Sequence, residues 1–138
     1  MLRYLDIETL RQWNSFKKMR IENNKSHNFR KLEIWKRAME LVEKVYFHTA
    51  QLPDSEKFGL KSQINRCAVS IPSNIAEGSG RKTDKEFICF LRFSMSSSYE
   101  IETQLLLIQN LFDINTEELI SEFKNLQNMI GGFIRSIE

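Results

Sequence analysis

Apolar side chains recur every three or four residues along four successive stretches of this chain. That spacing places them on one face of an α-helix, whose period is 3.6 residues. The first stripe begins at Leu32 and ends near Leu52, where Pro53 and Asp54 interrupt it. Because each amphipathic helix has to bury its apolar face, four of them in sequence predict helices packed on one another.

The second stripe extends from Leu60 to Ile75. We expect Asp54 or Ser55 to cap this helix, because a side-chain oxygen there can accept from the free N–H groups of the first turn. Gly78-Ser79-Gly80 ends the stripe, and glycine at this place predicts a left-handed C-terminal cap.

The third stretch opens on a capping box, in which Thr83 precedes Glu86 by three residues, and continues to about Phe112. Thr116 is expected to cap the fourth helix. Gly131-Gly132 lies inside that helix, and each glycine costs about 1 kcal/mol relative to alanine. We therefore expect the fourth helix to fray or bend there.

Short connections between helices imply antiparallel neighbours. The sequence thus predicts an all-α fold, an antiparallel up-and-down four-helix bundle over residues 29–138. Residues 1–28 form an N-terminal extension with helical spacing at Ile7, Leu10 and Trp13, which has room for a short extra helix, followed by a polar linker over 22–28. A native arm, a helix that docks on a partner and a weakly structured lead-in all remain open.

Cysteine and histidine are rare in this chain. Cys67 and Cys89 lie among apolar neighbours on helical patterns, so we expect two reduced core thiols. His27 and His48, the two histidines, are not near a cysteine in sequence, and the four residues make a poor metal set. With no glycine-rich phosphate loop either, we expect no metal, no cofactor and no enzymatic activity.

No apolar run approaches the ~20 residues needed to cross a bilayer. The first residues also lack the uninterrupted apolar stretch of a secretion signal. We expect a cytoplasmic protein that does not bind membranes.

Charge is distributed unevenly, although the formal net charge is only +2. Residues 1–31 hold eight Lys/Arg and three Asp/Glu, residues 56–92 hold seven and four, and residues 113–138 hold two and five. A basic face could bind nucleic acid, or the acidic end of one subunit could meet the basic middle of another. The candidate nucleic-acid-binding residues of the middle segment are Lys57, Lys61, Arg66, Arg81, Lys82, Lys85 and Arg92.

Pro72 is unusual inside the second helical pattern. Proline lacks an N–H and clashes with the carbonyl four residues back, at a cost near 3 kcal/mol, so a kink or a helix restarting at Pro72 is expected. Beside the apolar stripe lies a polar ridge, formed by Gln63, Arg66, Ser70, Asn74 and Glu77.

The third helix faces this ridge with small side chains, which let a neighbouring helix come close: Ser94, Ser96, Ser97 and Ser98. We expect Arg66 to pair with an acid such as Glu77 or Glu100, which would set the register of the two helices more than their stability. These residue types also occur in active sites, but a histidine base is missing, which favours the structural interpretation.

The segment from Gln63 to Arg81, QINRCAVSIPSNIAEGSGR, resembles the signature of the ribosomal-RNA intervening-sequence protein family. These are bacterial four-helix-bundle proteins first noticed as reading frames inside inserts of 23S ribosomal RNA genes. The flanks are similar too, from Phe29-Arg-Lys-Leu32 with Trp35 to Ser98 and Glu100. The resemblance extends over Phe29–Glu138 and leaves out residues 1–28.

This resemblance implies a ring-like homopentamer. It also implies kinship with the accessory proteins of diversity-generating retroelements, which bind nucleic acid and a reverse transcriptase. Carried over by position, Asn74, Glu77 and Gly78 would fix the second helix and its end, and Arg66, Arg81 and Lys82 would be basic positions. No catalytic residue is carried over. The full structural signature is Gln63, Ser70, Pro72, Asn74, Glu77, Gly78, Ser98 and Glu100.

Two functions follow as hypotheses. The first is a non-catalytic homo-oligomeric adaptor that binds RNA or DNA through a basic surface, as an accessory to a reverse transcriptase or another ribonucleoprotein. The second is a protein–protein interaction module without a nucleic-acid ligand, in which the acidic fourth helix and residues 1–28 contact a partner.

Overall fold

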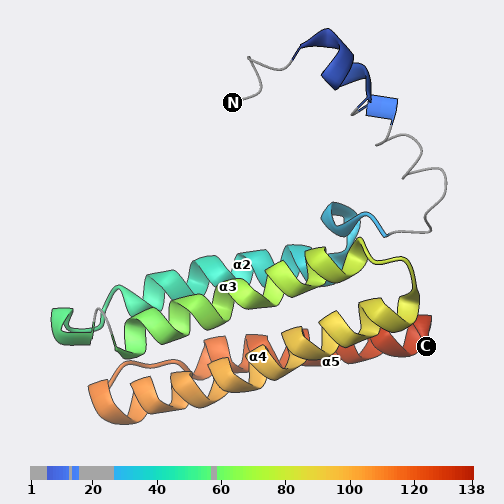
Figure 1. Cartoon of the computed structure of the whole chain (residues 1–138). Helices are drawn as coiled ribbons and strands as arrows, with labels where there is room; N and C mark the ends of the chain where they lie inside the picture. The colour runs from blue at the N-terminus through green and yellow to red at the C-terminus, as the bar shows by residue number, and fades with distance from the viewer. Residues whose placement is uncertain (1–5, 13, 16–26, 57–58) are drawn as a thin grey trace.

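The computed structural model, which describes residues 6–12, 14–15, 27–56 and 59–138, is an antiparallel up-and-down four-helix bundle (Figure 1). The all-α prediction is confirmed, and the described residues contain no strand. The helices of the bundle are α2 (Glu33–Thr49), α3 (Leu60–Ser79), α4 (Asp84–Phe112) and α5 (Glu117–Ile137), with 3-10 turns η2 (Phe29–Lys31) and η3 (Asp54–Glu56).

The predicted short extra helix is present at the N-terminus. Residues 7–12 and 14–15 are helical, and the Asp6 carboxylate accepts a hydrogen bond from the Thr9 N–H at 2.6 Å. This hydrogen bond satisfies one of the free N–H groups of the first turn.

Each bundle helix packs beside its neighbours in the chain. α3 contacts α2 and α4, and α5 contacts α4 and α2, which closes the square. Short connections force this order, because a few residues cannot carry the chain across the bundle. Within the described part of the chain, no helix has the length and apolar character needed to cross a bilayer.

The core lies on the central axis, where the four predicted stripes meet. Its most deeply buried side chains are Leu41, Val45, Ile64, Ile71, Ile75, Phe87, Leu91, Ile101, Leu105, Ile108, Phe123, Leu126 and Ile130. The cysteines differ from the expectation: Cys67 is buried, but Cys89 is exposed. Cys89 lies two residues after Phe87, which is too few to bring it back to the buried face of α4.

α3 runs without a break through Pro72, so the expected restart at the proline is wrong. Side-chain donors instead bond to carbonyls in the turns around it. The Ser94 hydroxyl of α4 donates to the Ile71 carbonyl at 2.8 Å, and the Asn74 amide donates to the Ser70 carbonyl at 2.8 Å. The carbonyl that loses its helical partner to Pro72 is that of Ala68, four residues back, so these two bonds do not replace the missing one; they tie the neighbouring turns to α4 and to the Asn74 side chain.

The left-handed glycine cap expected at the end of α3 is absent. Gly80 has φ −87°, in the right-handed region, and the left-handed residue is Asp113 after α4, with φ 54°. Aspartate is one of the few residues besides glycine that adopt this conformation readily. Gly131-Gly132 neither ends nor interrupts α5, which continues to Ile137.

At the helix starts, only the cap of α4 matches the prediction. The Thr83 hydroxyl oxygen accepts from the Glu86 N–H at 3.1 Å. Thr116 is buried, and its hydroxyl donates inward to the Leu105 carbonyl at 2.9 Å, so Asn115 caps α5 through the Glu117 N–H.

The start of α3 is likewise capped by a different residue. The Glu56 carboxylate accepts from the Leu60 N–H at 3.1 Å, in place of the expected Asp54 or Ser55. η3 explains the change, because its turn places Glu56 one turn before the helix.

Gly78 is required by packing and not by backbone conformation. A methyl group at this position would lie 2.6 Å from the Phe90 Cβ and 2.9 Å from the Phe87 Cδ1. The glycine therefore lets the end of α3 approach the start of α4 more closely than any other residue would allow.

We expect Gly78→Ala to destabilise the bundle by up to about 2 kcal/mol. Overpacking a tight core costs about 1–3 kcal/mol, of which the better helix propensity of alanine offsets ~1 kcal/mol. Urea denaturation followed by circular dichroism would measure the change.

Gly132→Ala is the matched control, because a methyl group there would meet only the flexible end of Arg135 at 3.7 Å. It should stabilise the protein by up to ~1 kcal/mol. Equal stabilisation by both substitutions would contradict the packing argument.

Candidate functional site

Charged side chains divide unevenly along the bundle axis. The half around the α3–α4 turn, residues 27–41, 70–98 and 127–138, holds nine Lys/Arg and six Asp/Glu. The other half, residues 42–56, 59–69 and 99–126, holds four Lys/Arg and nine Asp/Glu. Antiparallel packing creates this polarity, because it gathers segments from four places in the sequence at each end.

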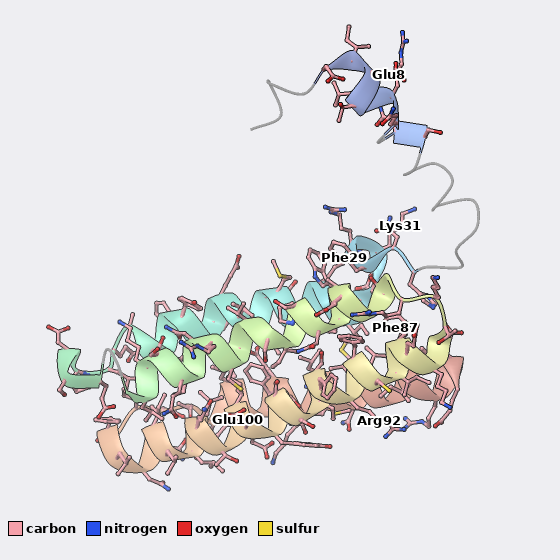
Figure 2. The ribbon with its side chains drawn as sticks, in the orientation of Figure 1. Glu8, Phe29, Lys31, Phe87, Arg92 and Glu100 are labelled. Carbon is pink, nitrogen blue, oxygen red and sulfur yellow. The ribbon has the colours of Figure 1, made fainter. Side chains whose placement is uncertain are left out.

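The basic end comprises the exposed cations near the α3–α4 turn: Arg30, Lys31, Arg81, Lys82, Lys85 and Arg92. η2 belongs here because it packs against α2 and α3. In Figure 2, Lys31 and Arg92 lie toward the same end of the bundle as Phe87, and Glu100 lies farther along it. The sequence analysis missed Arg30 and Lys31, which lie some fifty residues from the turn in sequence; only the up-and-down topology could have indicated them.

The remaining candidate cations lie elsewhere. Lys61 is at the start of α3, and twenty residues at 1.5 Å per residue place it roughly 30 Å from Arg81. Arg66 is on the exposed side of α3 between these two. Lys57 lies outside the described residues. The six candidates that the structure describes therefore do not gather at one end of the bundle.

Some cations of the basic end have partners within the subunit. The Arg81 guanidinium lies 3.2 Å from the Glu77 carboxylate and stacks over the Phe90 ring at 4.5 Å. Arg92 lies 3.8 Å from the Glu138 carboxylate. Within the described residues, however, Lys31, Lys82 and Lys85 make no ion pair, so their ammonium groups can meet an external anion.

His27 fixes the entry of the chain into the basic end. Its Nε2 lies 3.2 Å from the Asp84 carboxylate, and its ring packs on Phe87 at 5.0 Å and on Phe133 at 5.8 Å. The polar stretch over 22–28 thus ends in a residue that contacts α4 and α5.

A polar cleft of about 350 Å³ lies between α3 and α4, on the signature side of the bundle. The Ser70 hydroxyl donates to the Ser97 hydroxyl at 2.7 Å, and the Cys67 thiol donates to the Ser97 carbonyl at 3.2 Å. The small serines therefore join the two helices, as their size suggested. The residues lining the cleft are Ser62, Gln63, Arg66, Cys67, Ser70 and Glu100.

The expected pairing of Arg66 with Glu77 is wrong. Glu77 pairs with Arg81, one turn away, whereas Arg66 lies eleven residues and roughly 16 Å from it along the helix. Arg66 and Glu100 line the same cleft but form no ion pair within 4.0 Å in the described structure. Both charges are exposed, so each can still meet a group outside the subunit.

The other signature residues support the helices. Ser98 is fully buried and donates to the Met95 carbonyl at 2.6 Å. Gly78 provides the close approach described above, and Asn74 bonds to the backbone near Pro72. These contacts are intramolecular, which agrees with the structural interpretation of the ridge.

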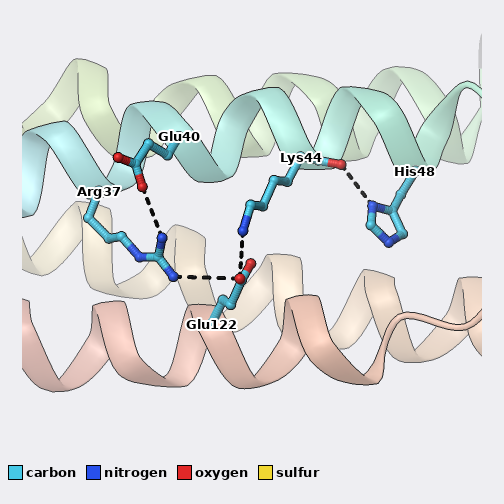
Figure 3. A network of polar contacts seen from close by, with 5 residues as sticks. All are labelled: Arg37, Glu40, Lys44, His48 and Glu122. Atoms are coloured by element: carbon cyan, nitrogen blue, oxygen red, sulfur yellow. Dashed lines mark hydrogen bonds and ion pairs between the residues drawn. The ribbon is translucent and has the colours of Figure 1, made fainter.

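On the opposite side, α2 and α5 are joined by a charge network (Figure 3). The Glu122 carboxylate, only 16% exposed, lies 2.6 Å from the Lys44 ammonium and 3.7 Å from the Arg37 guanidinium. Arg37 also contacts Glu40 at 2.9 Å, and the His48 ring bonds to the Lys44 carbonyl at 2.8 Å. The two cations of the network are neutralised by its two carboxylates, and the ion pairs between α2 and α5 fix the register of these helices.

The Cys67 thiol does not suit nucleophilic chemistry. Burial, and then the nearby Glu100 carboxylate, raise the pKa of Cys67 from 9.0 to about 12. Since the thiolate is the reactive form, this cysteine is inert at neutral pH. The raised pKa also means that the free energy of unfolding falls as the pH rises from about 9 toward 12, because only the unfolded thiol ionises there.

We expect a maleimide reagent at pH 8 to modify the exposed Cys89 quickly and Cys67 at least about a hundredfold more slowly, until denaturant is added. Mass spectrometry over time would measure both rates. Cys89→Ser should remove the fast reaction altogether. Two equally fast cysteines in the native protein would contradict the buried, protonated state of Cys67.

Comparison with known proteins identifies a family for the bundle residues. The family model described as 23S rRNA-intervening sequence protein matches residues 30–132, which is most of the bundle and excludes the N-terminal extension. No curated protein matches the chain. The chain belongs to the 23S rRNA-intervening sequence protein family.

Proposed function

We propose that this chain is a non-catalytic, homo-oligomeric adaptor in the cytoplasm that binds RNA or DNA through its basic end. The polarity of the bundle carries this proposal, because it concentrates exposed cations at one end and acids at the other. The family description, which refers to a sequence within 23S rRNA, supports a ribonucleoprotein setting.

The basic end suits a phosphate backbone better than a particular base sequence. Lys31, Lys82 and Lys85 present flexible point charges, which position nucleic acid without reading its bases. Binding of this kind releases counterions, so its affinity falls steeply with salt.

An exposed apolar face on α4 supports the homo-oligomer. Phe93, Leu107 and Leu111 share one helical face and are 56%, 43% and 65% exposed. Glu100, seven residues from both Phe93 and Leu107, places the polar cleft on the same face. Apolar residues around unpaired charges are typical of a protein contact.

Assembly would strengthen nucleic-acid binding. In a ring of copies, five by the family resemblance, several basic ends would act on one strand and gain affinity without new contacts. A reverse transcriptase or another ribonucleoprotein component would then bind the same assembly.

The acidic half favours a second candidate, a protein-interaction module without nucleic acid. Its nine acids against four bases would attract a basic protein, which here includes the basic end of another copy.

We expect Lys82→Glu/Lys85→Glu to weaken binding to a fluorescent single-stranded RNA by at least about tenfold at 100 mM salt. Losing two phosphate contacts should also lower the slope of log affinity against log salt by about 1.5–2. Fluorescence anisotropy over a salt series measures both quantities.

Lys61→Glu/Lys124→Glu makes the same change in net charge in the acidic half and should reduce affinity much less. An equal loss in both double variants would show that net charge, not the basic end, drives binding. No binding by the wild-type protein at low salt would remove the nucleic-acid part of the proposal.

We expect Phe93→Glu to dissociate the homo-oligomer, because a buried carboxylate in the subunit contact would have no partner. Light scattering after size-exclusion chromatography would report the mass. Phe47→Glu on α2 is the control, since Phe47 is 72% exposed and lies away from α4. A monomeric wild-type protein, or an oligomer unchanged by Phe93→Glu, would contradict this subunit contact.

A further inference from the structure

An apolar groove lies between α2 and α3, whereas the polar cleft lies between α3 and α4. Its volume is about 290 Å³. Met39 and Val69, on its two sides, are 43% and 42% exposed. All but one of the lining residues are apolar: Trp35, Met39, Val42, Val69, Pro72, Ser73 and Ala76.

Helical spacing shapes this groove for another helix. On α2, Trp35, Met39 and Val42 recur at four and three residues, and on α3 Val69 and Pro72 continue a similar row. Two parallel apolar rows with a furrow between them are the geometry that accepts an amphipathic helix.

The N-terminal helix has an apolar face of this kind. Ile7 and Leu10, three residues apart, lie on one side of it and are 70% and 37% exposed. In Figure 1 this helix, drawn in blue, stands apart from the bundle. An apolar helix face and an apolar groove, both open to solvent, thus occur in the same chain.

The chain is long enough to bring them together. The eleven residues 16–26 can span up to roughly 36–40 Å when extended. Met39 lies six residues, or roughly 9 Å, beyond Glu33 at the start of α2, so the groove is within reach. A short tether of this kind gives an effective concentration in the millimolar range.

Charge at the edges fits the same arrangement. Arg11 follows Leu10 on the N-terminal helix, and Glu43, next to Val42 on α2, is exposed. These two opposite charges can meet at the rim of the groove when the apolar faces are in contact.

We propose that the helical residues 7–12 dock into the α2–α3 groove of the same chain, with Ile7 and Leu10 against Met39 and Val69. The N-terminal helix then covers the α2–α3 side of the bundle, away from the polar cleft between α3 and α4. This inference does not depend on nucleic-acid binding.

Trypsin cleavage after Arg11 tests docking in the full-length protein, with cleavage after Arg20 as the internal reference. Met39→Glu places a charge in the groove and should release the N-terminal helix. The rate of cleavage after Arg11, divided by the rate after Arg20, should then rise at least about tenfold. Phe47→Glu, on the same helix but outside the groove, should leave the ratio unchanged. An equal ratio in the wild-type protein and Met39→Glu would overturn the proposal.

Disulfide trapping identifies the occupant. In a Cys89→Ser background, Leu10→Cys should form a disulfide with Met39→Cys or Val69→Cys under mild oxidation, and the product should have the mass of a monomer. Leu10→Cys with Phe47→Cys should not form one. If only disulfide-linked dimers form, the groove binds the N-terminal helix of a second copy. If neither pair forms a disulfide, the N-terminal helix does not bind in the groove. Either result overturns the proposal.

Discussion

The contact between α3 and α4 is the constraint on which the rest of the bundle depends. Gly78 lets the two backbones approach at the turn, and Ser94 and Ser97 keep them close for several turns beyond it. The same close approach lets the Ser94 hydroxyl of α4 donate to the Ile71 carbonyl of α3, next to Pro72. In this chain, the segment from Gln63 to Arg81 thus serves mainly to bring α3 close to α4.

Close packing at this turn also determines where the charges lie. The tight connection places Arg81, Lys82 and Lys85 beside the residues that enter α2, because antiparallel helices return to the same end. Acids from the other two connections gather at the far end. A chain with a net charge of only +2 therefore has a strong polarity, and polarity governs its encounters with anions more than net charge does.

The sides of the bundle differ in chemistry, which lets one small domain make several contacts. Between α2 and α5 the charges satisfy one another, and this side is closed. Between α3 and α4, Arg66 and Glu100 stand near exposed apolar residues of α4, and this side suits a copy of the chain. Between α2 and α3 the surface is almost wholly apolar, and this side suits a helix.

The sequence alone determined the four helices, their antiparallel order and nearly all of the core, because burial imposes a 3.6-residue period that can be read directly. It also predicted the cap at Thr83. The topology that it predicted already brings Arg30 and Lys31 to the end of the bundle where α3 turns into α4. It could not predict that Cys89 is exposed, that Glu56 caps α3, or that the Ser94 hydroxyl of α4 reaches the Ile71 carbonyl of α3. Only the tertiary structure decided those facts, because they depend on how each helix is rotated about its axis and on which side chains of neighbouring segments meet.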